Sequence, residues 1–557
     1  MKTINFKRSF IVWILLPGAM LFSQESQQEI DEPIQTAQAE VKGLDDKINE
    51  ALEPVATGWE SIVFTQVRIT SEHQLPVVVI LLGLGALFFT LIFFFPNITW
   101  FRLAIDTVRG KYDSIDKNDA KSTTKNGEVS HFQALTTAVS GTVGLGNIAG
   151  VAVAIAVGGP GATFWMIVCG FLGMSTKFVE CTLGVKYRDI DKDGVVHGGP
   201  MYYLSRGLAD FKLKNIKFGK FLGTFLATVF AIFCVGGALG GGNMFQSNQA
   251  TEQVTSLLNI QGGASGFVTG LIFAVLVGFV IIGGIKRIAT FTSKIVPFMA
   301  GIYILATLII ILVHFRYIDD AFGLIINSAF NPMAGLGGFI GVLIVGFRRA
   351  CFSNEAGAGS AAIAHSAVIT KYPASEGVVA LLEPFIDTVV ICTMTALVII
   401  FFNFSDGNFE SEFSYGNVQD SSVVLNETGE ELGGVDLTSR AFDSVLPNFS
   451  YILTIAIILF AFSTMISWSY YGIQSWKFLF GRSRLSDLSF KILFLVFLVI
   501  GASITLDSVV KFADAMILAL VFPNMIGLFI LFPKVKKELS KYLTAIGIRK
   551  LNPSKNV

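Results

Sequence analysis

Two stretches of the sequence place glycines, hydroxyls, an amide and a carboxylate where an apolar helix would otherwise continue. The first is SGTVGLGNIAG, residues 140–150, and the second is FSNEAGAGSAA, residues 352–362. Glycine costs about 1 kcal/mol relative to alanine inside a helix, so both stretches predict an interruption. An unwound turn inside a membrane leaves backbone N–H and C=O groups that must find partners, and a ligand can supply them.

The ends of interrupted helices suit a small zwitterion. Amino-terminal ends expose N–H donors that suit a carboxylate, and carboxyl-terminal ends expose carbonyls that suit Na+ or an ammonium group. The alternative is that small residues only allow two helices to pack closely. The matched glycine clusters, together with Ser140, Asn147 and Glu355, favour transport over packing alone.

Glu355 lies within the second stretch, and an ionisable group at membrane depth is a functional candidate. The structural alternative is that its carboxylate caps backbone donors of the unwound turn or pairs with Arg348 or Arg349. Lys177 and Glu180, near one end of an apolar segment, are expected to form a structural pair.

Four further side chains in apolar segments are candidates for binding. Gln246 can both donate and accept, which suits a polar group of a ligand; capping at the surface is the alternative. Ser463 and Thr464 offer hydroxyl oxygens of the kind that hard cations accept, although such residues in membrane helices more often bond to their own backbone. Trp468, one turn later, either walls a small pocket or packs against neighbouring helices.

The composition is that of a membrane protein. Of 557 residues, 52% are hydrophobic and 15% charged, against about 25% charged in soluble proteins. The net charge of zero gives no support to nucleic-acid binding. The five cysteines lie in or beside apolar segments without metal-ligand spacing, so neither a disulfide nor a metal site is expected.

Eleven membrane-spanning helices fit the hydropathy pattern. They cover approximately residues 75–97, 132–157, 162–186, 219–246, 266–284, 294–314, 335–366, 376–402, 449–478, 488–505 and 508–532. Alternate connections are rich in Lys and Arg, which marks them as cytoplasmic. This pattern predicts that the first span begins outside the cytoplasm and that the last one ends inside.

Ten of these spans divide into two sets of five, 132–314 and 335–532. Because five is odd, the second set crosses the membrane in the opposite direction, as in transporters built from inverted repeats. Each set begins with one of the glycine-rich stretches. The fold class predicted is an all-α membrane protein with a shared site at the two interruptions.

The remaining segments are assigned from composition. Residues 1–23 read as a secretory signal peptide, with an uncleaved anchor as the alternative, and 24–74 as an acidic extracytoplasmic segment. Residues 75–131 hold the extra first span and a cytoplasmic loop, 403–448 an acidic extracytoplasmic loop, and 533–557 a cytoplasmic tail.

Four motifs in order carry a family resemblance: GTVGLGNIAGVAVAIAVGGPGATFWM, HGGPMYYL, FSNEAGAGSAAIAHSA and FSTMISWSYYG. Together they resemble the alanine or glycine:cation symporter family of sodium-coupled amino-acid carriers. The resemblance implies a LeuT-like 5+5 inverted repeat with a broken first helix in each repeat and one extra helix in front. It also implies a transporter of the bacterial inner membrane, with Na+ as coupling ion and no other cofactor, that takes up alanine or glycine.

The resemblance also implies a binding site. The amides around Leu145 and Gly146 hold the substrate carboxylate, with Asn147 close by. The side chains that line the substrate chamber are Gln246, Phe352 and Trp468. Cys351 stands where the family suggests a smaller or aliphatic residue, so the preference between alanine and glycine stays open.

A second resemblance concerns the ion. TVGLGN is similar to the broken first core helix of the neurotransmitter:sodium symporters. It implies a Na+ site made by the carbonyls of Ser140 and Val143 and the hydroxyls of Ser463 and Thr464. The alternatives are a proton-coupled carrier, in which Glu355 must titrate, and a channel, for which the sequence shows no continuous polar pore. The lipid bilayer is the expected surrounding, and no oligomeric state is predicted.

Overall fold

The computed structural model describes most of the chain: residues 43–69, 74–117, 127–209, 218–260, 262–282, 284–331, 338–404, 407–416 and 421–548. The signal peptide expected at 1–23 lies outside these residues. In the described part, helices carry the fold, and the strands form three short antiparallel pairs.

Helices occupy every predicted span in the described part of the chain. They are α3 (Val77–Ile92), α7 (His131–Thr142), α8 (Ala149–Gly158), α9 (Gly161–Lys186), α11 (Phe218–Leu239), α12 (Phe245–Leu258), α13 (Ser265–Ile281), α14 (Gly284–Val313), α16 (Gly338–Asn354), α17 (Ala362–His365), α18 (Pro373–Val379), α19 (Leu382–Pro384), α20 (Thr393–Phe402), α22 (Ser450–Phe480), α23 (Arg484–Ser503), α24 (Leu506–Ala519) and α25 (Val521–Ala545). Seven described helical stretches are long and apolar enough to cross a membrane, and the bent pair α7–α8 makes eight. The chain is therefore an all-α, multi-pass membrane protein, while eleven spans and the inverted repeat stay predictions.

Some helices extend beyond the apolar residues that predicted them. α12 continues past residue 246 to Leu258 because its polar side chains find partners. Gln249 accepts a hydrogen bond from the Val435 amide at 2.8 Å, and Gln253 donates to the Thr454 hydroxyl at 2.9 Å. In the same way α25 runs past residue 532, so part of the predicted tail is helical.

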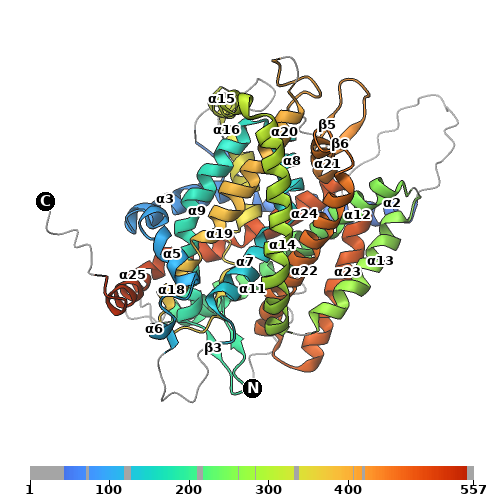
Figure 1. Ribbon diagram of the computed structural model, residues 1–557. Helices are drawn as coiled ribbons and strands as arrows, with labels where there is room; N and C mark the ends of the chain where they lie inside the picture. Colours follow the sequence, from blue (N-terminus) through green and yellow to red (C-terminus); the bar gives the residue numbers. More distant parts are fainter. Residues whose placement is uncertain are drawn as a thin grey trace.

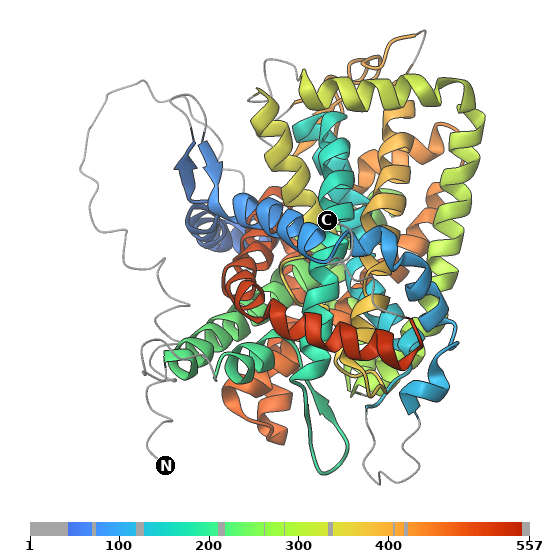
Figure 2. The same ribbon diagram turned by 90° about the vertical axis from the view of Figure 1, so that its left-hand side faces the viewer.

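The connections between spans gather at opposite ends of the bundle (Figure 1). One end carries α15 (Ile318–Phe330), the strands β5 (Ser422–Val424) and β6 (Glu431–Gly433), and α21 (Gly434–Asp443). Figure 2 shows α15 lying across that end, steeply inclined to α14. The other end carries β3 (Asp189–Ile190) and β4 (Val196–His197). There Asp189 accepts a hydrogen bond from Arg482 at 2.8 Å, which lowers the pKa of Asp189 below its ordinary value.

Before the first span lie α2 (Leu44–Val63) and the strand pair β1 (Gln66–Arg68) and β2 (Gln74–Pro76). The helix α2 is amphipathic, with Ala56 and Val63 buried, and it packs along α24. Its amphipathic pattern explains this position, because one face must be covered.

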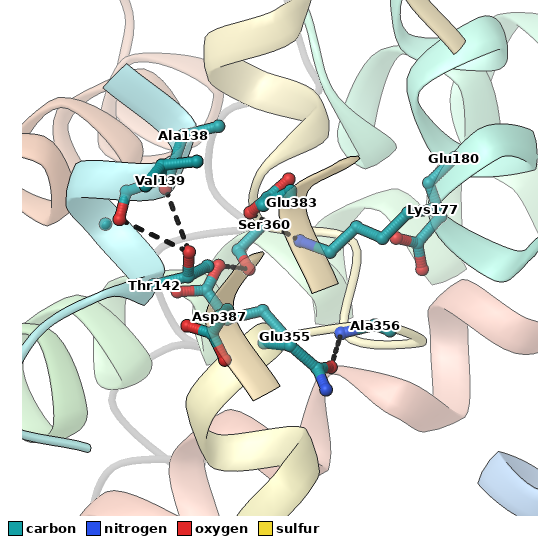
Figure 3. A network of polar contacts seen from close by, with 12 residues as sticks. Ala138, Val139, Thr142, Lys177, Glu180, Glu355, Ala356, Ser360, Glu383 and Asp387 are labelled. Carbon is teal, nitrogen blue, oxygen red and sulfur yellow. Dashed lines mark hydrogen bonds and ion pairs between the residues drawn. The ribbon is translucent and has the colours of Figure 1, made fainter. Parts of the chain in front are cut away.

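A chain of buried ionisable groups connects the helices around the second interruption. Lys177 of α9 pairs with Glu383 of α19 at 3.0 Å, and both side chains are fully buried (Figure 3). His365 contacts Glu383 at 3.3 Å and Glu376 at 2.5 Å, and Glu376 also contacts His131. The expected pair of Lys177 with Glu180 is wrong, because Lys177 reaches across to another helix.

Removing one member of this chain tests its structural role. Lys177→Met leaves Glu383 buried without its cation, which costs about 3–5 kcal/mol for a buried pair. We expect the detergent-purified variant to unfold at a clearly lower temperature. The double variant Lys177→Met/Glu383→Gln is expected to recover part of the loss, and losses that simply add would contradict this pairing.

Candidate binding site

The first interruption separates α7 from α8 by a short 3-10 turn, η2 (Leu145–Asn147), and bends the pair by 57°. Gly144 is extended here, and its N–H donates to the Asn147 side-chain oxygen at 3.0 Å. A Cβ at Gly144 would overlap the Thr464 hydroxyl and lie 3.1 Å from Gln246 Oε1. Glycine at this position therefore allows two neighbouring helices to reach the unwound backbone.

Gln246 is held against this interruption. Its Oε1 accepts from the Leu145 N–H at 3.0 Å, and its Nε2 donates to the Gly241 carbonyl at 3.0 Å. Only 3% of the residue is exposed, so capping at the surface, the alternative considered for it, is wrong. The side chain enters from the start of α12, directly after the π-helical turn η4 (Gly240–Met244).

The second interruption follows α16. Glu355, Gly357 and Gly359 have φ values of +57°, +90° and +84°, which end the helix before α17 begins. The freed Gly357 N–H donates to Glu180 Oε1 at 2.9 Å, and its carbonyl accepts from the Asn524 side chain at 2.8 Å. The unwound backbone is thus satisfied by side chains from α9 and α25.

Glu355 itself takes neither structural role expected for it. Its carboxylate accepts from the Ser360 hydroxyl across the interruption, as Figure 3 shows. Arg348 and Arg349 pair instead with Asp514 of α24. The expected capping of the backbone by Glu355 is wrong, because the Gly357 N–H donates to Glu180 instead.

A direct polar contact joins the two interruptions. The Asn147 amide donates to the Ser353 hydroxyl at 3.0 Å and to the Asp387 carbonyl at 3.3 Å. Ser353 in turn donates to Asp387 Oδ1 at 2.5 Å, while Asp387 Oδ2 is buried and has no hydrogen-bond partner among the described residues. Sequence reasoning missed Ser353 and Asp387, although an acid inside the predicted span 376–402 was the available signal.

Aromatic side chains surround this contact. A Cβ at Gly146 would lie 3.3 Å from the ring of Phe352, which also packs edge-on against Phe245 with centroids 4.9 Å apart. The Trp468 indole N–H donates to the Gly141 carbonyl at 3.2 Å. All ten residues expected at the substrate and ion sites are buried. Trp468 therefore both packs and borders the first interruption.

Neutral oxygens line the seam between α7 and α22. The Thr464 hydroxyl donates to the Ser140 carbonyl at 3.0 Å, and the Ser140 hydroxyl donates to the Ser463 carbonyl at 2.8 Å. Ser467, which sequence reasoning missed, donates to the Ser140 hydroxyl at 3.0 Å. The Ser463 hydroxyl itself bonds within its own helix at 3.0 Å. Val143 lies beside this seam as the residue that ends α7.

This donor set suits a hard cation of low charge, because such ions prefer oxygen ligands. In the described residues no group of three or more His, Cys, Asp or Glu side chains could hold a transition metal. Na+ at this seam stays a prediction.

Two cavities lie beyond the buried residues, one toward each end of the bundle. The Arg348 cavity, about 320 Å³, is lined by Glu60 of α2, by residues of α8, α16 and α24, and by Ser421, next to β5. The Tyr470 cavity, about 380 Å³, is lined by residues of α22, α13 and α14 and by His197 of β4. None of the ten predicted site residues lines either cavity. In the described residues, the candidate site is therefore buried and reached by neither cavity.

Known proteins resemble this chain over most of its length. The sodium/alanine symporter AgcS of Methanococcus maripaludis is 40% identical over 465 residues, 83% of this chain and 93% of that protein. The putative sodium/proton-dependent alanine carrier YrbD of Bacillus subtilis is 34% identical over 471 residues, 84% of this chain and 89% of that protein.

Among solved structures, MhsT in complex with L-phenylalanine covers 73% of this chain and 99% of its own, with a TM-score of 0.45 and 16% identity. A manganese transporter of Eremococcus coleocola covers 76% and 82%, with a TM-score of 0.44 and 14% identity. The profile of the sodium:alanine symporter family matches residues 60–555. The chain therefore belongs to the sodium:alanine symporter family, whose members are membrane transporters and not enzymes.

Proposed function

We propose that this transporter carries alanine or glycine together with Na+ into the cell by alternating access. The observation that carries the proposal is the contact of Asn147 with Ser353, which brings the two interrupted helices together beside a seam of neutral oxygens. The family and the printed name of the M. maripaludis relative support alanine and Na+. The proposed location is the bacterial inner membrane, with the C-terminus in the cytoplasm.

The amides of Leu145 and Gly146 are the proposed donors to the substrate carboxylate. Gln246 Oε1 occupies the Leu145 N–H in this conformation, so a carboxylate oxygen would replace one neutral acceptor by a charged one. Hydrogen bonds to charged acceptors are about twice as strong as neutral ones. The rings of Phe352 and Trp468 are the proposed walls of the substrate chamber, which would admit a small side chain and exclude a large one.

Na+ is proposed to bind at Ser140, Val143, Ser463 and Thr464. This position lies at the carboxyl-terminal end of α7, where helix carbonyls carry negative partial charge. Inward movement of one charge gains about 2.3 kcal/mol per 100 mV of membrane potential. If Na+ and the amino acid are released only together, this free energy also drives uptake of the amino acid.

The two cavities supply the proposed route. The Arg348 cavity begins one turn before Phe352 on α16, and the Tyr470 cavity begins directly after Trp468 on α22. Alternating access requires that the site opens to one cavity at a time. Opening to both cavities at once would dissipate the Na+ gradient.

A proton-coupled carrier is the second candidate. It is favoured by Glu355, a fully buried carboxylate in the second interruption that a proton would neutralise. Both candidates bind the same amino acids, and they differ only in the ion.

Counterflow of labelled alanine in liposomes that contain the full chain distinguishes them. We expect saturable exchange that requires Na+ and is indifferent to an imposed pH gradient. Exchange that persists without Na+ and follows the pH gradient would replace sodium by protons, and flux without saturation would indicate a channel.

Two glycines in one stretch provide a matched test of the substrate site. A methyl group at Gly146 meets Phe352, whereas the Cβ position of Gly150 has no atom within 4 Å. Overpacking costs about 1–3 kcal/mol, so we expect Gly146→Ala to weaken alanine binding roughly 5- to 150-fold. Gly150→Ala should bind normally. Equal affinities of the two variants for alanine would contradict the proposed site.

The ion site is tested by removing one hydroxyl. Thr464→Val deletes an oxygen at the Ser140 carbonyl, so we expect half-maximal uptake to need at least about 10-fold more Na+, the loss for 1.4 kcal/mol. Ser469→Ala is the control, since the Ser469 hydroxyl bonds only to the Ile466 carbonyl of the same helix at 2.7 Å. An unchanged Na+ requirement in Thr464→Val would exclude this residue as a ligand.

A further inference from the structure

The helix α2 lies across helices on which the proposed alternating access depends. Most of α2 precedes residue 60, where the match to the family begins, whereas Glu60 and Phe64 at its carboxyl-terminal end lie within the match. Its role must therefore be read from its own contacts.

Hydrogen bonds join the first half of α2 to the amino-terminal ends of α13 and α24. Asp45 accepts from the Gly266 and Phe267 amides at 3.0 and 3.2 Å, in the first turn of α13. The Asn49 side-chain oxygen accepts from both the amide and the hydroxyl of Thr505, the N-cap of α24, at 3.1 Å each. In these hydrogen bonds, side chains of α2 accept from backbone N–H groups at helix starts, which have no partner within their own helix. The bonds anchor the first half of α2.

The second half of α2 contacts α16. Glu60 pairs with Arg348 at 2.7 Å, and the Arg348 guanidinium lies 4.3 Å from the centroid of the Phe64 ring. Arg348 also contacts Asp514 of α24. The side chains of Glu60 and Arg348 are 23% and 22% exposed, so the pair is only partly shielded from water.

Arg349 extends this chain of contacts to the proposed substrate chamber. It shares Asp514 with Arg348, and its guanidinium lies 5.2 Å from the centroid of the Phe352 ring. Arg349 is 3% exposed, lines the Arg348 cavity, and leaves its Nη1 without a hydrogen-bond partner. Without Glu60, two arginines would share one carboxylate beside the cavity.

We propose that Glu60 of α2 is a positioning residue that acts through Arg348 to hold the Arg348 cavity narrow, and that α2 is a strap across this entrance. The inference rests on the alternating access proposed above, in which α16 separates from α24 when the cavity opens to the outside. Opening must break contacts of Arg348 with Glu60 or Asp514. The strap therefore stabilises the state closed to the outside.

The test uses intact cells that express the full chain with a reporter cysteine, Val153→Cys, in the Arg348 cavity. The five native cysteines are buried, so a membrane-impermeant thiol reagent added outside reports on the new one. Partly exposed ion pairs are weak, so we expect Glu60→Gln to raise the labelling rate roughly two- to fivefold. Glu60→Asp should restore a rate close to that of the unaltered residue.

Two comparisons keep the result specific. Glu53→Gln removes an exposed acid from the same helix and should label at the original rate. Phe64→Leu removes the ring beneath Arg348 and should shift the rate in the same direction as Glu60→Gln. Transport gives a second readout. In Glu60→Gln the apparent KM for alanine should fall by the same factor as the labelling rate rises, and kcat should not rise. A loss of folded protein would not lower KM.

An unchanged labelling rate in both Glu60→Gln and Phe64→Leu would overturn the strap. Labelling of the reporter only by reagent inside the cell would also overturn it, because the cavity would then face the cytoplasm. Absence of Na+-dependent alanine uptake by the unaltered chain is a separate outcome. It would remove the proposed function, while a labelling rate that still depends on Glu60 would support the strap as a closing contact.

Discussion

The need to satisfy unwound backbone inside a membrane governs this structure. Two helices stop and restart in the middle of the bundle, and each freed backbone group would be costly without a partner. The structure meets this need with side chains. At the first interruption these are Gln246 of α12 and Asn147 of the unwound turn itself, and at the second Glu180 of α9 and Asn524 of α25. Asn147 also bonds to Ser353, so the two interruptions form one unit. Because these partners are side chains and not backbone groups of the same helix, a ligand can compete with them for the freed N–H and C=O groups.

Charge is distributed so that the proposed chamber stays nearly neutral. The oxygens between α7 and α22 come from carbonyls and hydroxyls, whereas the ionised groups pair with one another further along the bundle, as Lys177 does with Glu383. Asp387 is the exception, because its carboxylate borders the contact between the interruptions with one oxygen unpaired. A second cluster, Arg348 and Arg349 around Asp514, lies between the chamber and the cavity that we propose faces outward.

Local features of the fold were predictable from sequence, and partners across the fold were not. Glycine density located both interruptions, and apolar runs located the helices, because these signals lie within one segment. The partner of Lys177 was missed because Glu383 is distant in sequence and meets it only after α9 packs on α19. The burial of Gln246 depends on which face of α12 turns inward, which a short polar stretch does not reveal. Gly146 lies beside Phe352 and Asn147 bonds to Ser353, while the roles that the family resemblance implies for these residues stay proposals.

We propose that the joined interruptions form one amino-acid site that Na+ completes. Equilibrium binding of labelled alanine to the detergent-purified full chain, in NaCl and in choline chloride, tests it most directly, with Asn147→Leu alongside. We expect saturable binding of alanine in NaCl and much weaker binding in choline chloride. We also expect Asn147→Leu to lose binding, because its side chain no longer joins the two interruptions. Equal binding in both salts, or an unaltered affinity in Asn147→Leu, would contradict it.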